Sequence, residues 1–353
     1  MKSVCIICGG KSHEHEISLL SATSVLREID RSRYEVHTVI IDEDGQFFCS
    51  EQAEAGVVLS GGGWRALADL RPAWVVPDPS LCGYLRQEEN GALTRILVDV
   101  FFPVLHGENG EDGVIQGLLK MTGIPYVGSG VLSSASCMDK EVTHVRLDAA
   151  GIATAPYIVV RQGEESAAQV DTRLRERIGY PAFVKPANAG SSVGVSRVNG
   201  PEELAVALQN AFSVDRKVLI EACIIGAEVE CAVIGCEQPQ AAEVVGQIAP
   251  AASFYDYDAK YTDNSTQLYI PARISEETAE KIRKTALWAY RVMDCAGLAR
   301  VDFFALPDGR VLLNEINNIP GFTAISMYPK LFEASGVGYR ELIDRLIESA
   351  AVK

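Results

Sequence analysis

Short apolar runs alternate with helical patterns in the first third of the chain. The run at 3–8 reads SVCIIC, and after two glycines apolar residues recur at helical spacing through 17–29. Two further apolar runs, at 34–42 and 98–105, predict strands, and a helical pattern follows the second one after the glycine-rich loop HGENGEDG. This order is typical of a parallel α/β unit, in which ligands bind where the strands end.

The rest of the chain carries two more units of strands and helices. A helical pattern begins near residue 138 and precedes two apolar strands, PYIVV and PAFVKP, which a polar helix separates. Apolar runs crowd together between 217 and 248, which predicts a mostly antiparallel sheet. An amphipathic helix over 275–294 begins at Ser275, a favourable N-cap residue. The stretch from about 50 to 95 has weak periodicity and many Gly, Pro and polar residues, so we expect it to be irregular.

Asp308 and Gly309 predict a two-residue hairpin turn between two apolar runs. That turn gives three cross-strand pairs: 307 with 310, Asp302 with Glu315, and Arg300 with Asn317. The last four side chains then share one face, where two facing carboxylates destabilise the sheet unless a cation lies between them. Asp, Glu and Asn supply the hard oxygen ligands that Mg²⁺ prefers when it also holds substrate phosphates. We therefore favour a magnesium site over a solvated strand face, on which charges would alternate in sign.

The composition excludes two classes of partner. The chain has 353 residues, enough for two or three domains, and a net charge of -15. Nucleic acids and anionic membranes call for a basic surface, so an anionic ligand would need a locally basic pocket. No apolar run reaches the length of a signal core or a membrane span. Nine cysteines in apolar contexts suit reduced thiols in a cytoplasm, and the C-x-x-C of Cys5 and Cys8 lies in a predicted buried strand.

Three lysines and one turn are candidates for phosphate binding. Lys140 starts a helix, Lys185 ends the strand PAFVKP, and Lys260 lies within YDYDAKYTD. Each of them alone is better explained as a solvated surface charge, although an interior position is favoured for Lys185. The neighbouring turn ANAGSSVG offers backbone N–H groups and hydroxyls to phosphate oxygens, but turn conformation alone also explains its glycines.

Three other motifs suggest a different chemistry, but each lacks a feature that this chemistry requires. The segment 190–194 matches the G-x-S-x-G pattern of a serine hydrolase, but all five histidines precede Ser192, whereas that fold places its histidine after the serine. The stretch GGKS lacks the first glycine of a Walker A loop. Adjacent side chains diverge in SHEHE, which disfavours a metal site there. Glu14 within it is either an acid at a helix start or a ligand for the ammonium group of a small substrate.

Taken in order, eight motifs resemble those of the D-alanine–D-alanine ligases of the ATP-grasp superfamily. They are GGKSHEHEISLLSA, VLHGENGEDGVIQG, SCMDKEVTH, FVKPANAGSSVGVS, VLIEACIIGAEVE, FYDYDAKY, ARVDFF and NEINNIPGFTAISMYPK. The similarity runs through almost the whole chain except roughly 50–95. It implies an α/β fold, α+β in part, with ATP held between two sheets. The implied domains are a Rossmann-like parallel N-terminal domain at 1–137, a central ATP-grasp subdomain at 138–223 and a C-terminal ATP-grasp subdomain at 224–353.

The resemblance also implies roles for the motif residues. The nucleotide would be contacted by Lys140, Lys185, Ser192, Glu221, Ile224, Glu228, Lys260 and Asn314. Two magnesium ions, or manganese in their place, would be held by Asp302, Glu315 and Asn317. The first D-alanine would lie against Glu14 and His106, with Arg300 and Gly321 stabilising oxyanion charge. The second would be held by Lys260, Ser326 and Met327. Ser191 and Tyr261 would connect Glu14 to a mobile loop at 250–270 that closes over the site.

The implied reaction is the ATP-dependent ligation of two D-alanine molecules through an acyl phosphate, for peptidoglycan precursors, in a cytoplasmic homodimer. Tyr261 and Met327 favour D-alanine as the second substrate, and the alternative is a ligase of the glycopeptide-resistance type that takes D-serine or D-lactate. A different ATP-grasp ligase would share the nucleotide and metal residues but not Glu14 and His106. A non-catalytic nucleotide-binding module would have no need of the lysines and metal ligands.

Overall fold

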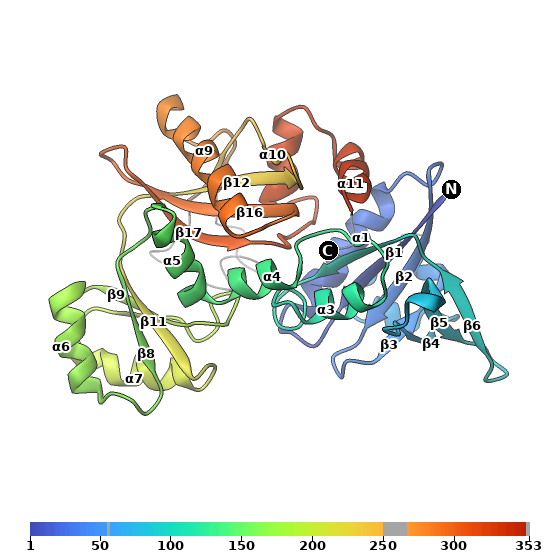
Figure 1. The fold of residues 1–353 in the computed structure, drawn as a ribbon, viewed down its shortest axis with the longest axis horizontal. Coiled ribbons are helices and arrows are strands. Elements are labelled where there is room, and N and C mark those ends of the chain that lie inside the picture. The colour runs from blue at the N-terminus through green and yellow to red at the C-terminus, as the bar shows by residue number, and fades with distance from the viewer. Residues whose placement is uncertain (55–56, 250–266, 351–353) are drawn as a thin grey trace.

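The described part of the chain forms three β-sheets (Figure 1). The structure, a computed structural model, describes residues 1–54, 57–249 and 267–350. Lys260 and Tyr261 lie outside the described residues. Within the described part, no helix has the length and apolarity needed to cross a membrane.

The first sheet has seven strands in the order β6-β5-β4-β3-β2-β1-β7. Their bounds are β1 Lys2–Gly9, β2 Tyr34–Ile41, β3 Phe47–Cys49, β4 Arg71–Trp74, β5 Gly83–Gln87, β6 Leu93–Leu97 and β7 Val100–Leu105. Strands β2, β1 and β7 run parallel, as the apolar runs predict, because the helix α1 (His15–Glu28) connects β1 to β2. Cys5 and Cys8 are buried in β1, where burial raises the pKa of the Cys8 thiol to about 12, so this pair is structural.

The expectation that residues 50 to 95 are irregular is wrong. This segment contains the helix α2 (Glu51–Glu54), 3-10 helices at Gly63–Ala66 and Pro79–Leu81, and the strands β4, β5 and β6, which extend the first sheet in antiparallel fashion. The strands are short, and β6 is an edge strand with both its leucines exposed, so its apolar pattern marks no core face. The turn at Asn90 and Gly91, which closes the β5–β6 hairpin, was the available signal.

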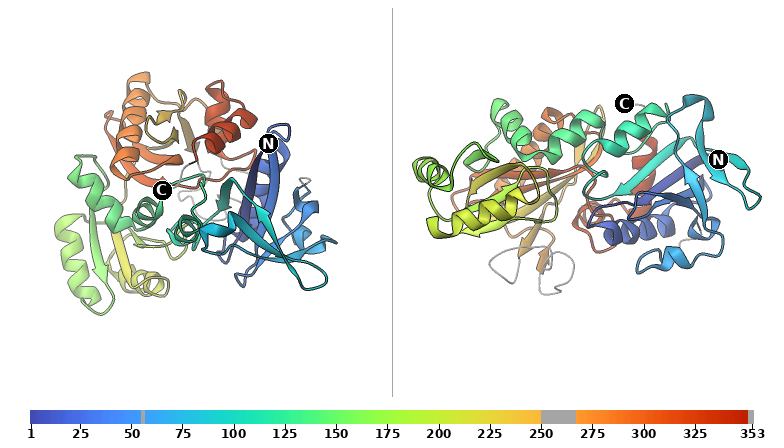
Figure 2. Two further views of the ribbon diagram at one scale, coloured as in Figure 1. Left: turned by 45° about the vertical axis from the view of Figure 1, so that its right-hand side comes forward. Right: turned by 90° about the horizontal axis from the view of Figure 1, so that it is seen from below.

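The second sheet has four strands in the order β10-β9-β11-β8. Their bounds are β8 Tyr157–Arg161, β9 Ala182–Pro186, β10 Ser196–Val198 and β11 Lys217–Ala222. The helices α6 (Ala167–Arg177) and α7 (Pro201–Phe212) pack against one face of this sheet, as Figure 1 shows. The helices α3 (Val114–Met121), α4 (Val131–Met138) and α5 (Lys140–Ala149) form a row that links it to the first sheet (Figure 2).

The third sheet has the order β15-β14-β12-β16-β17, with β13 paired to β12. Its bounds are β12 Ala227–Gly235, β13 Gln240–Ala241, β14 Gly246–Ala249, β15 Gln267–Tyr269, β16 Gly297–Ala305 and β17 Val311–Asn317. The pairing of the strands near 217 to 248 is antiparallel, as predicted, but they do not form one sheet, because β11 belongs to the second sheet and β12, β13 and β14 to the third. The predicted N-cap is also confirmed, because Ser275 accepts a hydrogen bond from the Thr278 amide at the start of α9 (Glu276–Val292).

The two faces of the third sheet differ in what covers them. Val229, Cys231 and Val233 of β12 pack with α9 in one core. Ala232 and Ile234 point to the other face and pack with α10 (Met327–Ala334). That second core also contains residues of β1, α1 and α11 (Tyr339–Glu348), so it joins the first sheet to the C-terminal helices. The even-numbered residues at the start of β12, Glu228 and Glu230, therefore share the α10 face.

The hairpin between β16 and β17 corrects one prediction and confirms another. The turn is not a two-residue one: the Leu306 amide donates to the Arg310 carbonyl, and Gly309 adopts φ +81°. A three-residue loop of this kind shifts the register by one residue. A bulge between Asp302 and Phe303 then shifts it back, so that Asp302 pairs with Glu315 and Arg300 with Asn317, as predicted.

Gly297, the first residue of β16, offers a test of how closely the segments pack. A Cβ atom at Gly297 would lie 2.7 Å from the backbone nitrogen of Gly128, whereas one at Gly309 would meet nothing within 4 Å. Both glycines have positive φ, so alanine at either should cost ~1–2 kcal/mol of backbone strain. We predict a further loss of ~1–3 kcal/mol in Gly297→Ala alone, because backbone atoms must move. Urea denaturation measures both variants, and equal midpoints for the two would contradict the prediction.

Candidate active site

Three carboxylates lie in one row across three adjacent strands of the third sheet. Glu230 on β12 pairs with Asp302 on β16, and Asp302 pairs with Glu315 on β17. The Arg300 guanidinium donates to both Asp302 oxygens, at 2.8 and 2.7 Å, and its Nε lies 3.2 Å from Glu230 Oε2. Burial opposes the charge on Arg300, but Asp302 and Glu230 outweigh it and raise its pKa well above the usual range. A cation therefore does lie among the facing carboxylates, as the sequence requires.

The row fits a hard divalent cation beside Arg300. Asn317 pairs with Arg300 across the strands, and its buried Oδ1 has no hydrogen-bond partner within the described chain. An amide oxygen beside two carboxylates, Asp302 and Glu315, is a donor set that suits Mg²⁺. No cluster of three or more His, Cys, Asp or Glu placed for a metal ion occurs among the described residues. A magnesium ion here would thus depend on the amide and on substrate oxygens to complete its shell.

A second buried charge pair lies on the four-stranded sheet. Lys185 on β9 donates to Glu221 Oε2 on β11 at 2.5 Å, and His144 Nε2 lies 3.0 Å from Glu221 Oε1. Burial opposes ionisation of Glu221, yet the charge of Lys185 and the His144 hydrogen bond hold its pKa well below the usual range. The Lys185 pKa is raised because the carboxylates, first Glu221 and then Glu315, outweigh the burial of the ammonium. Charges on the third sheet therefore act on Lys185 of the second.

The turn at 189–195 lies between these groups and α5. Lys140 Nζ donates to the Ala189 carbonyl at 2.6 Å, and the Lys140 amide donates to Ala187. Ser191 and Ser192 both adopt positive φ, +49° and +60°, which residues other than glycine rarely do. Two such residues in succession cost ~1–3 kcal/mol each, and strain of this size concentrates at functional sites.

Glu14, at the start of α1, meets the same turn, and His106 lies close by at the end of β7. Glu14 is buried, and its Oε2 lies so close to Gly107 and Gly190 that added Cβ atoms would be 2.9 and 3.5 Å away. His106 follows β7, and its Nδ1 lies 3.1 Å from the Ile319 carbonyl. The first sheet, the turn and the segment after β17 are thereby brought together.

The segment after β17 carries the remaining candidates of the C-terminal part. Ser326 Oγ accepts from the Thr323 amide at 3.0 Å, and a Cβ on Gly321 would lie 3.0 Å from that oxygen. Met327 begins α10, is buried, and packs so closely on Gly246 that a Cβ there would overlap its sulfur. The Ser326 hydroxyl and the Met327 thioether are therefore neighbours at the start of α10.

The remaining candidates within the described chain lie on β12 and β17 or in the connection before β12. Ile224 lies in the connection between β11 and β12, and Asn314 is the extra residue of the β17 bulge. Glu228 pairs with Phe304, and its charge contributes to the raised pKa of Lys185. Lys260 and Tyr261 fall outside the described residues.

Three residues of this region are not among the candidates from the sequence. Glu230 follows Glu228 at the strand period of two, but its place in the carboxylate row depends on the pairing of β12 with β16. Glu111 Oε1 lies 3.5 Å from His106 Nδ1, and no spacing rule predicts that contact. His144 lies four residues after Lys140 on α5, so the helical period was the available signal.

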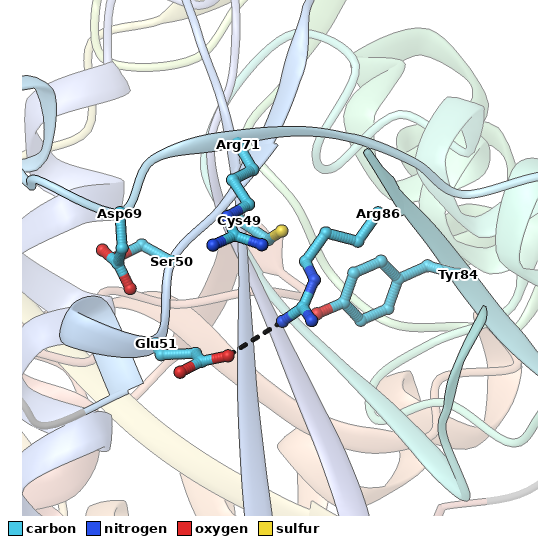
Figure 3. A pocket seen from close by; sticks show the side chains of 7 residues that line it. All are labelled: Cys49, Ser50, Glu51, Asp69, Arg71, Tyr84 and Arg86. Atoms are coloured by element: carbon cyan, nitrogen blue, oxygen red, sulfur yellow. Dashed lines mark hydrogen bonds and ion pairs between the residues drawn. The ribbon is translucent and has the colours of Figure 1, made fainter. Parts of the chain in front are cut away.

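A small pocket elsewhere on the first sheet does not belong to this region. Figure 3 shows its lining residues, Cys49, Ser50, Glu51, Asp69, Arg71, Tyr84 and Arg86. It encloses about 30 Å³. Its arginines are neutralised by ion pairs, such as Arg86 with Glu51 at 3.0 Å and with Glu88 at 3.0 Å. The pocket is therefore not a nucleotide site.

The chain is similar to known ligases over almost its whole length. The family described as D-ala D-ala ligase N-terminus matches residues 3–129, and D-ala D-ala ligase C-terminus matches 147–348. A D-alanine–D-alanine ligase of Acetivibrio thermocellus is 46% identical to this chain, and the match covers 99% of this chain and 96% of the ligase. D-alanine–D-alanine ligase A of Escherichia coli K12 is also 46% identical, with coverages of 98% and 95%.

Two solved structures have the same fold. The VanG D-Ala:D-Ser ligase from Enterococcus faecalis superposes with a TM-score of 0.87 at 35% identity, covering 98% of each chain. The D-alanine–D-alanine ligase from Coxiella burnetii gives a TM-score of 0.86 at 35% identity, covering 99% of this chain and 95% of its own. The α/β architecture expected from the sequence is thereby confirmed.

Glu111 should make stability depend on pH. Burial raises the pKa of Glu111 from 4.5 to about 6, so the folded chain binds this proton more tightly than the unfolded one. The stabilisation is present at low pH and is lost as pH rises through about 6. Between pH 5.5 and 7.5 the wild type should lose about 1 kcal/mol relative to Glu111→Gln.

Thermal unfolding across this pH range measures the difference between the two proteins. Glu89→Gln, at an exposed carboxylate on the same sheet, serves as the control and should follow the wild-type profile. Parallel profiles for Glu111→Gln and the wild type would contradict the prediction.

Proposed function

Because the chain belongs to the D-alanine–D-alanine ligase family, we propose that it joins two D-alanine molecules to D-alanyl-D-alanine with ATP. The observation that carries the proposal is the similarity itself: curated ligases match over nearly the full length at about 45% identity. The site supports it, since two buried cation–carboxylate clusters, around Lys185 and around Arg300, are electrostatically coupled. An enzyme that handles a triphosphate and two zwitterions needs charges of both signs away from bulk water.

We assign the nucleotide to the space between the second and third sheets. Lys140 and Lys185 would face its phosphates, with Ser192 in the turn between them. Glu221 and Ile224 would lie at the adenine and Glu228 at the ribose, and Asn314 would also contact the nucleotide. The lysines would offset the repulsion when the carboxylate of the first D-alanine attacks the γ-phosphate and forms an acyl phosphate and ADP.

The two amino acids would lie on the side of the first sheet. Glu14 would bind the ammonium group of the first D-alanine, and His106 would also lie against this substrate. The amine of the second D-alanine then attacks the acyl carbonyl and phosphate leaves. Arg300 and the Gly321 amide would stabilise the oxyanion. The second carboxylate would be held by Lys260, Ser326 and the Met327 backbone.

Two further assignments concern the closure of this site. We propose that Ser191 connects Glu14 to Tyr261 and that the segment 250–270 covers the reacting groups, which would protect the acyl phosphate from water. We also propose the division into domains 1–137, 138–223 and 224–353. The topology supports this division because each sheet lies within one proposed domain: β1–β7 in the first, β8–β11 in the second and β12–β17 in the third.

Magnesium would be held by Asp302, Glu315 and Asn317, and manganese could replace it. When bound there it would supply positive charge beside the transferred phosphoryl group. The support is the hard donor set and the buried Asn317 oxygen without a hydrogen-bond partner in the described chain.

D-Alanine is the second substrate that we propose, and D-serine and D-lactate are the alternatives. Curated relatives named D-alanine–D-alanine ligase are 42% to 46% identical, whereas at 35% identity one solved structure is a D-Ala:D-Ser ligase and another a D-alanine–D-alanine ligase. Met327 supports D-alanine because a buried thioether offers no strong partner to the hydroxyl of D-serine.

We further propose a cytoplasmic homodimer that supplies peptidoglycan precursors. All nine cysteines are free, which suits a reducing compartment. Trp74, Leu93 and Leu97 are exposed on the β4–β6 part of the first sheet, and the strand register places them on one face. Such a face on two copies could pair.

The first test is phosphate release from ATP by the purified protein with magnesium. We expect release to require D-alanine, and D-alanyl-D-alanine to be the main product when D-alanine and D-serine are supplied equally. Release independent of D-alanine would refute the ligase assignment. A larger amount of mixed D-alanine–D-serine product would favour the alternative.

The second test addresses the metal donors. Asn317→Leu removes the amide oxygen, so we expect about a tenfold or greater rise in the magnesium concentration needed for half-maximal activity. Asn317→Asp keeps an oxygen and should recover most of the affinity. Isothermal titration with Mn²⁺ in the presence of ADP gives a readout independent of turnover. Unchanged metal dependence in Asn317→Leu would remove Asn317 from the proposed set.

A further inference from the structure

A buried histidine that the proposed reaction does not use lies on α5. His144 Nε2 is 3.0 Å from Glu221 Oε1, and His144 Nδ1 is 2.9 Å from Thr154 Oγ1. The ring of Tyr157 lies against its face, with centroids 4.3 Å apart and planes at 30°. His144 is 3% exposed, so its ring is held in one orientation.

The hydrogen bonds of this cluster form a continuous chain. An ionised Glu221 can only accept, so Nε2 of His144 carries the hydrogen in their contact. The other ring nitrogen, Nδ1, is engaged by the Thr154 hydroxyl, which also has the Asp148 carboxylate and the Ala155 carbonyl at 3.4 Å. The second Glu221 oxygen accepts from Lys185. From Thr154 to Lys185 each donor has an acceptor, which is the condition for a stable buried polar network.

We propose that His144 is a positioning residue for nucleotide binding: it orients the Glu221 carboxylate and, through it, the Lys185 ammonium. This rests on the proposed function, in which Glu221 lies at the adenine and Lys185 at the phosphates. His144 itself need not touch the nucleotide, because its two ring nitrogens are already engaged by Glu221 and Thr154.

The helix explains how this positioning reaches the phosphate turn. Lys140 and His144 are four residues apart on α5, so their side chains project from the same helix face. Lys140 contacts Ala189 of the turn, and His144 contacts Glu221 of β11. One helix thereby sets the distance between the two ends of the proposed nucleotide site.

Loss of the His144 donor should weaken nucleotide binding more than it slows the reaction. Glu221 would keep Lys185 as a partner, but its Oε1 would face a buried apolar side chain and the carboxylate would be free to turn. The groups around the two D-alanine molecules lie on other elements, namely Glu14 before α1 and Ser326 before α10.

The test compares His144→Leu with His144→Gln. Leucine fills similar space without a donor, whereas glutamine supplies an amide N–H. In His144→Leu we expect the Kd for ADP, measured by calorimetry without D-alanine, and the KM for ATP to rise about tenfold or more. The kcat at saturating ATP and the KM for D-alanine should stay within about twofold, and glutamine should restore most of the ADP affinity. Val145→Gln changes the next residue of α5, which is exposed, and should bind ADP as the wild type does.

The outcomes distinguish a positioning role of His144 from a structural role and from failure of the proposed function. Wild-type ADP affinity in His144→Leu would overturn the inference. Equal loss of kcat and thermal stability in both His144 variants, without a selective effect on ADP, would show a purely structural residue and also overturn it. If the wild type bound ADP but released no phosphate with D-alanine, the proposed function would fall, while the ADP affinities would still decide the role of His144.

Discussion

The burial of like charges on neighbouring strands is the constraint around which this site is built. Glu230, Asp302 and Glu315 face one another across β12, β16 and β17, an arrangement that a sheet tolerates only with a compensating cation. Arg300 supplies one by bonding Asp302 and approaching Glu230. Lys185 and Glu221 repeat the solution on the second sheet. Each of these two sheets thus brings buried carboxylates to the site together with a cation of its own.

The parts of the fold with strong periodicity could be predicted from the sequence. The parallel strands β1, β2 and β7, the helix α9 with its Ser275 cap, and the antiparallel third sheet follow from apolar spacing and capping chemistry. The segment at 50 to 95 could not be read in this way, because its strands are short and the leucines of β6 are exposed. Its hairpin signal at Asn90 and Gly91 was local, whereas the hydrophobic pattern was weak.

In the candidate site, too, contacts within one hairpin could be predicted from the sequence, whereas contacts between segments far apart in the sequence could not. The facing of Asp302 and Glu315 was predictable since one hairpin connects them, although the prediction depended on two register shifts that cancel. The place of Glu230 required the pairing of β12 with β16, which are separated by about 70 residues. The contact of His144 with Glu221 became visible only once α5 and β11 lay together, because contacts between distant segments leave no pattern in a single sequence. Glu111 lies in the same loop as His106, and its contact depends on how that loop folds.

The core that joins the first sheet to the C-terminal helices has a consequence for how the chain folds. Ile6 and Val36 of the first sheet pack in the same core as Leu342 and Ile347 of α11. During synthesis the β1–α1–β2 unit leaves the ribosome before α11 exists, so this core is at first covered only in part, by Leu19 and Leu26 of α1. Packing of α11 against β1 and β2 therefore completes a core that the strands and α1 begin.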